Sequence, residues 1–113
     1  MSNPSRGEVW WVDLNPTRGR EQRCRRPALV ISVDKFNHGP SLMVVIVPIT
    51  STNRRIPFHI EVRPPEGKLD HTSYLQCDQV RCVSRHRLVG LLGPVYEDTM
   101  LQVEDRLRIL LGL

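Results

Sequence analysis

The sequence of 113 residues lacks most features that mark exported, disulfide-linked or membrane proteins. It has three cysteines, an odd number without the spacing of a disulfide framework, which is typical of a reducing compartment. The N-terminal residues contain no apolar signal-peptide segment, and the longest apolar run, LMVVIVPI, is far too short to span a bilayer. We therefore expect a cytoplasmic protein that does not enter a membrane.

Aromatic residues and lysine are also scarce, and the chain has no repeat, low-complexity tract or linker. Aromatic residues make up 5% of the sequence, and lysine supplies only two of the 16 basic residues. Apolar residues at 40% and charged residues at 25% are typical of a soluble globular protein. The length suits one domain with a single modest core, which we expect to comprise residues 1–113.

The positive charge is concentrated in one short segment. The formal net charge is +4, and the stretch RGREQRCRR (18–26) holds five arginines and one glutamate, which equals the whole excess. Such a density of like charge destabilises a compact state unless a negative partner is present. The planar guanidinium group suits bidentate phosphate contacts. The segment therefore indicates a nucleic acid, or an acidic protein segment, as the partner.

Hydropathy patterns predict a mainly β protein with a C-terminal helix. Five segments have the composition of strands: 8–14, 27–33, 42–50, 57–63 and 73–84, the last being one long strand or two short ones meeting near Gln79. The nearly continuous apolar run of 27–33 is typical of a strand buried on both faces, and Pro48 indicates a bulge or an edge position. Apolar residues recur at helical spacing from Glu97 onward, with Asp98 or Thr99 as the expected cap. This order suggests a small antiparallel barrel or twisted sheet carrying one helix.

Histidines offer an alternative source of acid–base chemistry, because two histidines can cleave RNA as a pair. The spacing pairs none of the four: His38, His59, His71 and His86. His59 and His71 are the leading candidates among them.

The cysteines and tryptophans are better explained by structure than by chemistry. Cys77 and Cys82 are too far apart for the usual C-x2-C zinc site and no second half-site follows, so we expect neither a metal nor another cofactor. If residues 8–14 form a strand, Trp10 and Trp11 point to opposite faces. One indole then belongs to the core, and the outer one could support a dimer interface or, less favourably, stack on a base.

Several segments in order give a specific pattern: RGEVWWVDLNPTRGREQ, RPALVIS, VVIVPITS, PFHIEV and CDQVR. Together they resemble the MazF/PemK family of toxin–antitoxin ribonucleases, also called Kid-like toxins, over nearly the whole chain. The resemblance implies an SH3-like barrel, shared with the gyrase-poisoning CcdB toxins, and a homodimer. It also implies metal-independent, sequence-specific cleavage of single-stranded RNA, leaving 2′,3′-cyclic phosphate and 5′-hydroxyl ends and so inhibiting translation. A cognate antitoxin would cover the RNA groove with an acidic, largely disordered tail.

The resemblance also implies which residues carry the reaction. The family's catalytic arginine and threonine correspond to Arg26 and Thr50, and its loop glutamate corresponds to Glu21. A guanidinium at position 26 would stabilise the dianionic phosphorane, since its pKa is too high for a general base. The Thr50 hydroxyl would hydrogen-bond a phosphate oxygen, and Glu21 would accept the 2′-hydroxyl proton or orient the arginine. Asp78 is the second candidate base, or else an ordinary ion-pair partner, for example of Arg81.

Other polar residues are expected to bind the RNA around that centre. Contacts to the phosphate backbone are expected from Arg20, Arg23, Arg25, Arg54, Arg55 and Arg81. Contacts to base edges are expected from Gln22, Ser51 and Gln79. Asp78, in the CDQ triplet shared with the PemK branch, is included among the RNA-binding residues.

The chain departs from the family pattern at three positions. Gln76 replaces an arginine of the PemK branch, Arg20 replaces a histidine of its loop, and Cys24 replaces a glycine found in many members. These departures favour the arginine–threonine scheme over the PemK-branch scheme. Two other functions stay open: a non-enzymatic toxin of the CcdB type that binds DNA gyrase, and a degenerate member that only binds RNA or an antitoxin.

Overall fold

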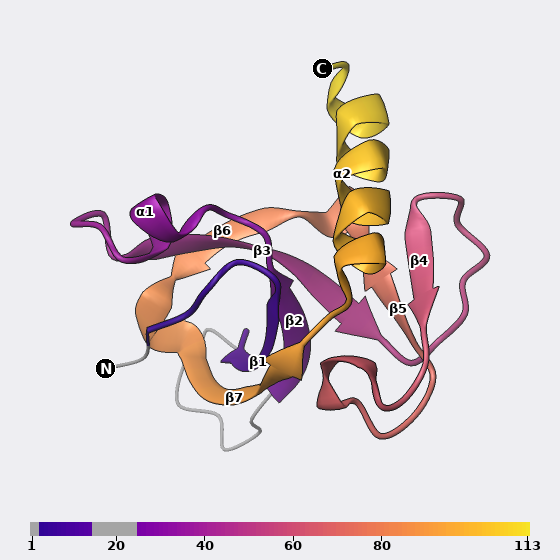
Figure 1. Cartoon of the computed structure of the whole chain (residues 1–113), viewed down its shortest axis with the longest axis horizontal. Helices are drawn as coiled ribbons and strands as arrows, with labels where there is room; N and C mark the ends of the chain where they lie inside the picture. The colour runs from indigo at the N-terminus through magenta and orange to yellow at the C-terminus, as the bar shows by residue number, and fades with distance from the viewer. Residues whose placement is uncertain (1–2, 15–24) are drawn as a thin grey trace.

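A computed structural model describes residues 3–14 and 25–113. Its secondary structure is mainly β, with one long helix at the C-terminal end (Figure 1). The strands are β1 (Glu8–Asp13), β2 (Arg25–Val30), β3 (Met43–Thr50), β4 (His59–Val62), β5 (Ser73–Gln76), β6 (Arg81–Ser84) and β7 (Leu88–Pro94). The helices are α1 (Asp34–Asn37) and α2 (Glu97–Leu111), with short 3₁₀ turns η1 (Glu66–Lys68), η2 (Cys77–Gln79) and η3 (Arg85–Arg87). The fold class expected from the sequence is confirmed.

The strands form one antiparallel sheet in the order β4-β5-β3-β2-β1-β7, and β6 also pairs with β3. β3 is the central strand: its first half pairs with β6 and its last two residues, Ile49 and Thr50, pair with β5. Pro48 pairs with Ala28 of β2 and lies between those two pairings. Of the two expectations for this residue, an edge position is therefore wrong, and the alternative, a bulge, agrees with the interruption of the pairing on one side of β3. The missing N–H of proline is tolerated there because the ladder on that side of β3 is already interrupted.

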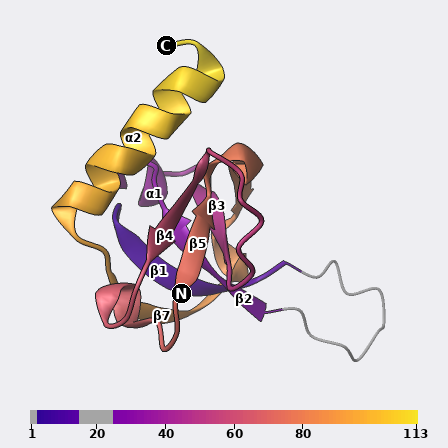
Figure 2. The same cartoon turned by 90° about the vertical axis from the view of Figure 1, so that its right-hand side faces the viewer.

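The sheet has a buried apolar cluster on each face, as the two-residue period of the strands requires. One cluster includes Val9, Leu29 and Val47 and is covered by Val103 of α2. The other includes Trp10, Ala28, Val30, Val44, Ile46 and Val83. Ala28, Leu29 and Val30 have no exposed surface, so the strand predicted to be buried on both faces is confirmed. Figure 2 shows α2 lying along one side of the curled sheet.

The start of α2 is held by a residue from a distant turn. The N-cap position is Tyr96, whose side chain makes no capping hydrogen bond, so the expected cap at Asp98 or Thr99 is wrong. Instead, the buried carboxylate of Glu66 in η1 accepts the Tyr96 N–H at 3.0 Å and the Thr99 hydroxyl. This contact ties the helix to the turn between β4 and β5.

Two strand assignments remain: the segment 73–84, for which the sequence left two alternatives, and β7, which the sequence did not predict. Residues 73–84 form two short strands, β5 and β6, separated by η2, which ends at Gln79. Of the two alternatives expected from the sequence, two short strands are therefore confirmed. β7 is a strand that no pattern indicated, because its glycines and terminal proline resemble a turn. Neither helix in the described ranges has the length and apolarity needed to span a bilayer.

Candidate functional site

Arg26 and Thr50 lie on neighbouring strands at the same end of the sheet. β2 pairs with β3 in a register that sets Ala28 opposite Pro48. Continued by two residues, that register sets Arg26 opposite Thr50 and directs both side chains to the same face. The pairing itself ends at Ala28 and Pro48, and the sequence-predicted pair lies two residues beyond it, where both residues line the same hollows described below.

The Thr50 hydroxyl is held by its own turn. Its Oγ1 accepts the N–H of Thr52 at 3.2 Å, so the hydroxyl proton points elsewhere and can be donated to a bound oxygen. Within residues 3–14 and 25–113, the guanidinium group of Arg26 has no ion-pair partner. The pair thus offers a cation and a hydroxyl donor side by side, an arrangement that suits a phosphate.

A hollow of about 280 Å³ opens beside this pair, and we call it the arginine hollow. Three arginines line it, and none of its described lining residues is a carboxylate. The polar lining comprises Arg26, Arg54, Arg81, Thr50, Gln76 and Gln79. Arginines and amides from β2, β5, β6 and the loop after β3 therefore converge, which gives a cationic surface with hydrogen-bonding groups for an anionic ligand.

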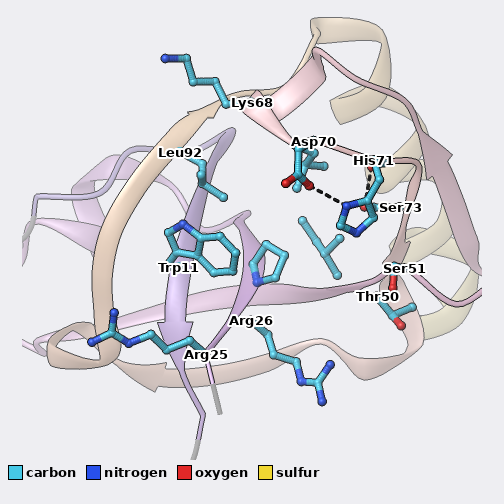
Figure 3. Close-up of a pocket in the computed structure, with 13 residues that line it drawn as sticks. Trp11, Arg25, Arg26, Thr50, Ser51, Lys68, Asp70, His71, Ser73 and Leu92 are labelled. Atoms are coloured by element: carbon cyan, nitrogen blue, oxygen red, sulfur yellow. Dashed lines mark hydrogen bonds and ion pairs between the residues drawn. The ribbon is translucent and has the colours of Figure 1, made fainter. Parts of the chain in front are cut away.

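A second hollow, of about 200 Å³, lies at the same end of the sheet, and we call it the indole hollow (Figure 3). Its apolar lining is Trp11, Pro27, Ile49, Leu69 and Leu92, and its polar lining includes Arg25, Ser51, Lys68, Asp70 and His71. Arg26 and Thr50 line both hollows. RNA contacts are predicted from the sequence for Arg25 and Ser51, but this hollow is not, since it depends on β7 and the turn before β5.

Asp78 does not line either hollow; it is engaged by a histidine. Its Oδ1 is 2.8 Å from Nε2 of His59, a side chain that is only 4% exposed. The expected ion pair between Asp78 and Arg81 is therefore wrong. The spacing of the histidines could not reveal the contact, because β4 must pair with β5 before His59 reaches η2.

The remaining sequence-predicted residues divide into two groups. Arg55 is exposed beyond β3, where its N–H donates to the Asn53 side chain. The second group lies outside the described residues: Arg20, Glu21, Gln22, Arg23 and Cys24. In the described part of the chain, no three His, Cys, Asp or Glu side chains are grouped so as to hold a metal ion.

Trp10 and Trp11 occupy opposite faces of β1, as the strand period predicts. Trp10 is 8% exposed and belongs to the core, whereas Trp11 is 39% exposed and lines the indole hollow. The cross-strand partners of Trp11 are Pro27 of β2, which lines the same hollow, and Gly90 of β7, which has no side chain to cover the indole.

Comparisons with known proteins place this fold in a family. The crystal structure of MazF from Deinococcus radiodurans has a TM-score of 0.82 and 28% identity, with each chain covered completely. MazF in the MazE–MazF complex of the same organism has a TM-score of 0.85 and 28% identity, over 100% of this chain and 99% of that one. An endoribonuclease from a mycobacterial species, solved with its cognate antitoxin, has a TM-score of 0.77 and 26% identity, over 100% and 97% of the two chains.

The sequence itself matches a family profile almost throughout. Residues 5–111 match the family described as PemK-like, MazF-like toxin of type II toxin–antitoxin system. The chain therefore belongs to the PemK-like, MazF-like toxin family of type II toxin–antitoxin systems.

Proposed function

We propose that this protein is a sequence-specific endoribonuclease that cleaves single-stranded RNA without a metal ion and inhibits translation as the toxin of a type II system. The reaction would use the 2′-hydroxyl next to the cleaved bond as nucleophile. The 2′-oxygen–phosphorus bond forms as the phosphorus–5′-oxygen bond breaks, which leaves a 2′,3′-cyclic phosphate and a 5′-hydroxyl. The observation that carries the proposal is that Arg26 and Thr50, at the ends of the paired strands β2 and β3, both line the arginine hollow.

The chemistry of this pair fits the charge that develops in such a reaction. The five-coordinate phosphorus carries two negative charges, and preorganised donors aimed at its oxygens lower the barrier. The Arg26 guanidinium supplies a cation, and the Thr50 hydroxyl supplies a hydrogen-bond donor held by Thr52. Glu21, four residues before β2 in the sequence, is our proposed acceptor of the 2′-hydroxyl proton.

The walls of the arginine hollow supply the contacts needed to hold and read RNA. Arg54 and Arg81 would bind backbone phosphates, which makes binding dependent on salt concentration. The amides of Gln76 and Gln79 can hydrogen-bond base edges of unpaired nucleotides. We assign Asp78 no direct contact with RNA, since its carboxylate is held by His59 and it does not line either hollow.

The same cationic surface suits an inhibitor with an acidic tail. Relatives from Deinococcus radiodurans and a mycobacterial species were crystallised with their antitoxins. We propose that a cognate antitoxin covers the arginine hollow with a disordered acidic segment that orders on binding. We also propose that the toxin acts as a homodimer.

The first experiment is cleavage of a long single-stranded RNA by the purified protein in EDTA, with the new ends mapped. Discrete cuts with 2′,3′-cyclic phosphate ends are expected from the wild-type protein. The Arg26→Ala variant should be slower by roughly a hundredfold or more. Arg63→Ala, which removes an exposed arginine paired with Glu61, is the matched control and should cleave normally.

Other outcomes would point elsewhere. Cleavage that survives Arg26→Ala would remove this arginine from the centre of the mechanism. Absence of cleavage on several diverse RNAs would contradict the nuclease and favour gyrase binding, or a member that only binds RNA or its antitoxin.

A further inference from the structure

His59 is a buried histidine whose polar contact is explained neither by the core nor by the proposed cleavage. Its side chain is only 4% exposed, and its Nε2 lies 2.8 Å from Oδ1 of Asp78. Because a carboxylate only accepts hydrogen bonds, Nε2 carries the hydrogen and donates it. Within residues 3–14 and 25–113, the other ring nitrogen, Nδ1, is buried and has no hydrogen-bond partner. The bond to Asp78 is therefore what satisfies the polar side of this ring.

Stability alone does not account for a polar pair at this place. A buried polar atom without a partner costs free energy, whereas two apolar side chains of the same shape can be nearly neutral. The ring of His59 bears that cost at Nδ1. The role of the pair is therefore to be found in the turn to which Asp78 belongs.

Asp78 is the middle residue of η2, a single 3₁₀ turn with little backbone support of its own. The Val80 N–H donates to the Cys77 carbonyl at 3.4 Å, which is longer than a usual backbone hydrogen bond. Turns of this type also have poorer hydrogen-bond geometry than an α-helix. The orientation of η2 is therefore set mainly by what its side chains contact.

The side chains of this segment leave it in three directions. Cys77 is fully buried in the apolar cluster covered by α2, and Val80 packs against the same cluster. The side chains that line the arginine hollow are those of Gln76, Gln79 and Arg81. Asp78 instead turns toward β4, where His59 holds it. The core thus fixes the two ends of the turn, and the hydrogen bond between His59 and Asp78, which we call the η2 brace, fixes its middle.

Strand pairing places His59 behind the wall of the arginine hollow. His59 of β4 is the cross-strand partner of Gln76 of β5, so the two side chains share one face of the sheet. Figure 2 shows these two strands side by side. Gln76 lines the hollow, whereas His59 is not among its described lining residues. The histidine therefore lies one strand further from the hollow and does not offer its own ring to a ligand there.

The strand that carries His59 is itself held firmly. Ile60 and Val62 are buried in the apolar cluster covered by α2. Nε of Arg106 in α2 donates to the Pro57 carbonyl at 3.2 Å, two residues before His59. A side chain fixed in this way can brace a turn that its own backbone holds weakly.

We propose that His59 is a positioning residue that sets the base preference of cleavage, because the η2 brace fixes the direction in which Gln79 presents its amide to RNA; this inference rests on the proposed function. Discrimination between base edges requires hydrogen-bonding side chains that are held in place by their surroundings. Arg26 and Thr50 come from β2 and β3, and the Thr50 hydroxyl is held by its own turn. Loss of the brace should therefore change which sequence is cut more than how fast the best sequence is cut.

The test measures base preference in variants that differ at the brace. Each purified protein cleaves a pool of single-stranded RNA with randomised positions around the cut, in EDTA, and sequencing of the products gives the relative kcat/KM for each base. His59→Leu removes the donor and should reduce the preference at one position by roughly two- to tenfold, the range expected for one hydrogen bond. His59→Gln places an amide donor near the position of Nε2 and should restore most of that preference.

Matched variants separate this role from general damage. Glu61→Gln changes an exposed residue on the same strand and face as His59 and should keep the wild-type preference. His38→Leu removes another histidine hydrogen bond, to the Pro4 carbonyl, and should keep it as well. The double variant His59→Leu/Asp78→Leu replaces both partners by apolar groups, so its urea unfolding midpoint should stay near that of wild type while its base preference stays low.

A second measurement follows the turn without any cleavage. In isotope-labelled protein, nuclear magnetic resonance gives the side-chain amide signals of Gln79 and, as a reference, of Gln102, which is exposed on α2 and contacts Asp98. His59→Leu should shift the Gln79 signals, and His59→Gln should return them toward their wild-type positions. Glu61→Gln should leave both sets of signals unchanged.

The outcomes distinguish this inference from the function on which it rests. If wild-type protein cleaves RNA in EDTA and His59→Leu keeps both the base preference and the Gln79 signals, the inference fails and the nuclease stands. If a folded His59→Leu cleaves no sequence at all, His59 acts in the reaction itself and the positioning role is overturned. If Asp78→Asn changes the preference and His59→Leu does not, Asp78 contacts RNA directly and the inference again fails. If wild-type protein cleaves no RNA, the proposed function fails and the preference role fails with it, and a shift of the Gln79 signals then reports a structural brace alone.

Discussion

Replacing Glu66 should destabilise the protein more than any exposed carboxylate does, because this side chain caps α2 from a distance. Its Oε2 accepts the Tyr96 N–H at 3.0 Å and the Thr99 hydroxyl, and the side chain is 7% exposed. A hydrogen bond to a charged group contributes about 1.5–3 kcal/mol, and a carboxylate at a helix N-terminus adds about 0.3–1 kcal/mol. Since the two bonds share one oxygen and are not additive, we expect Glu66→Ala to lower the free energy of unfolding by roughly 3 kcal/mol.

Two further substitutions separate the charge from the hydrogen bonds. Glu66→Gln keeps an acceptor oxygen and should cost only about 1 kcal/mol. Glu97→Gln removes an exposed acid in the first turn of α2 and should cost about 0.5 kcal/mol. Urea unfolding followed by circular dichroism gives the midpoint and slope for each variant. Equal losses for Glu66→Ala and Glu97→Gln would refute the view that Glu66 holds the helix.

Three further outcomes follow from burial and backbone geometry. Burial raises the pKa of the Cys77 thiol from 9.0 to about 11, so iodoacetamide at pH 8 should alkylate exposed Cys82 and spare Cys77, and equal labelling by peptide mass mapping would contradict this. Because that thiol pKa is higher in the folded than in the unfolded chain, the free energy of unfolding should fall by up to about 1.4 kcal/mol per pH unit between pH 9 and 11. Urea midpoints of Cys77→Ala should decline less over that range. Gly67→Ala should cost about 2 kcal/mol or more, since φ is +65° and the new Cβ would lie 2.8 Å from Val9 Cγ2. Gly112→Ala, at φ +71° in open space, should cost only about 1 kcal/mol by the same urea assay.

The elements that the sequence predicted well are those whose signal is local. The helix from Glu97 has a regular apolar stripe, and the strand 27–33 has an apolar run, so periodicity alone identifies them. β7 was missed because glycine and proline normally mark turns, whereas here Gly90 lies opposite the large ring of Trp11. Its pairing with β1 depends on a tertiary contact that no window of the sequence contains.

The predictions of the α2 cap and of the Asp78 partner were wrong for a related reason. Sequence rules look for a cap within the first turn of a helix, yet Glu66 lies 30 residues before Tyr96. Likewise, Asp78 was matched with a nearby arginine, but His59, 19 residues away, is brought to it by the pairing of β4 with β5. Polar contacts of this kind follow from strand order, which residue spacing does not determine.

The candidate site shows how much a single strand register decides. The order of Arg25 and Arg26 before Pro27 is readable from the sequence, but which face of the sheet each arginine leaves depends on the pairing of Ala28 with Pro48. A slip of one residue would exchange the faces of every side chain on β2. Burial of Ala28 and Val30 on one face and Leu29 on the other disfavours that slip, because it would exchange side chains of different size between the two packed cores. The packing of three apolar residues in the middle of β2 therefore fixes the direction of two arginines at its end.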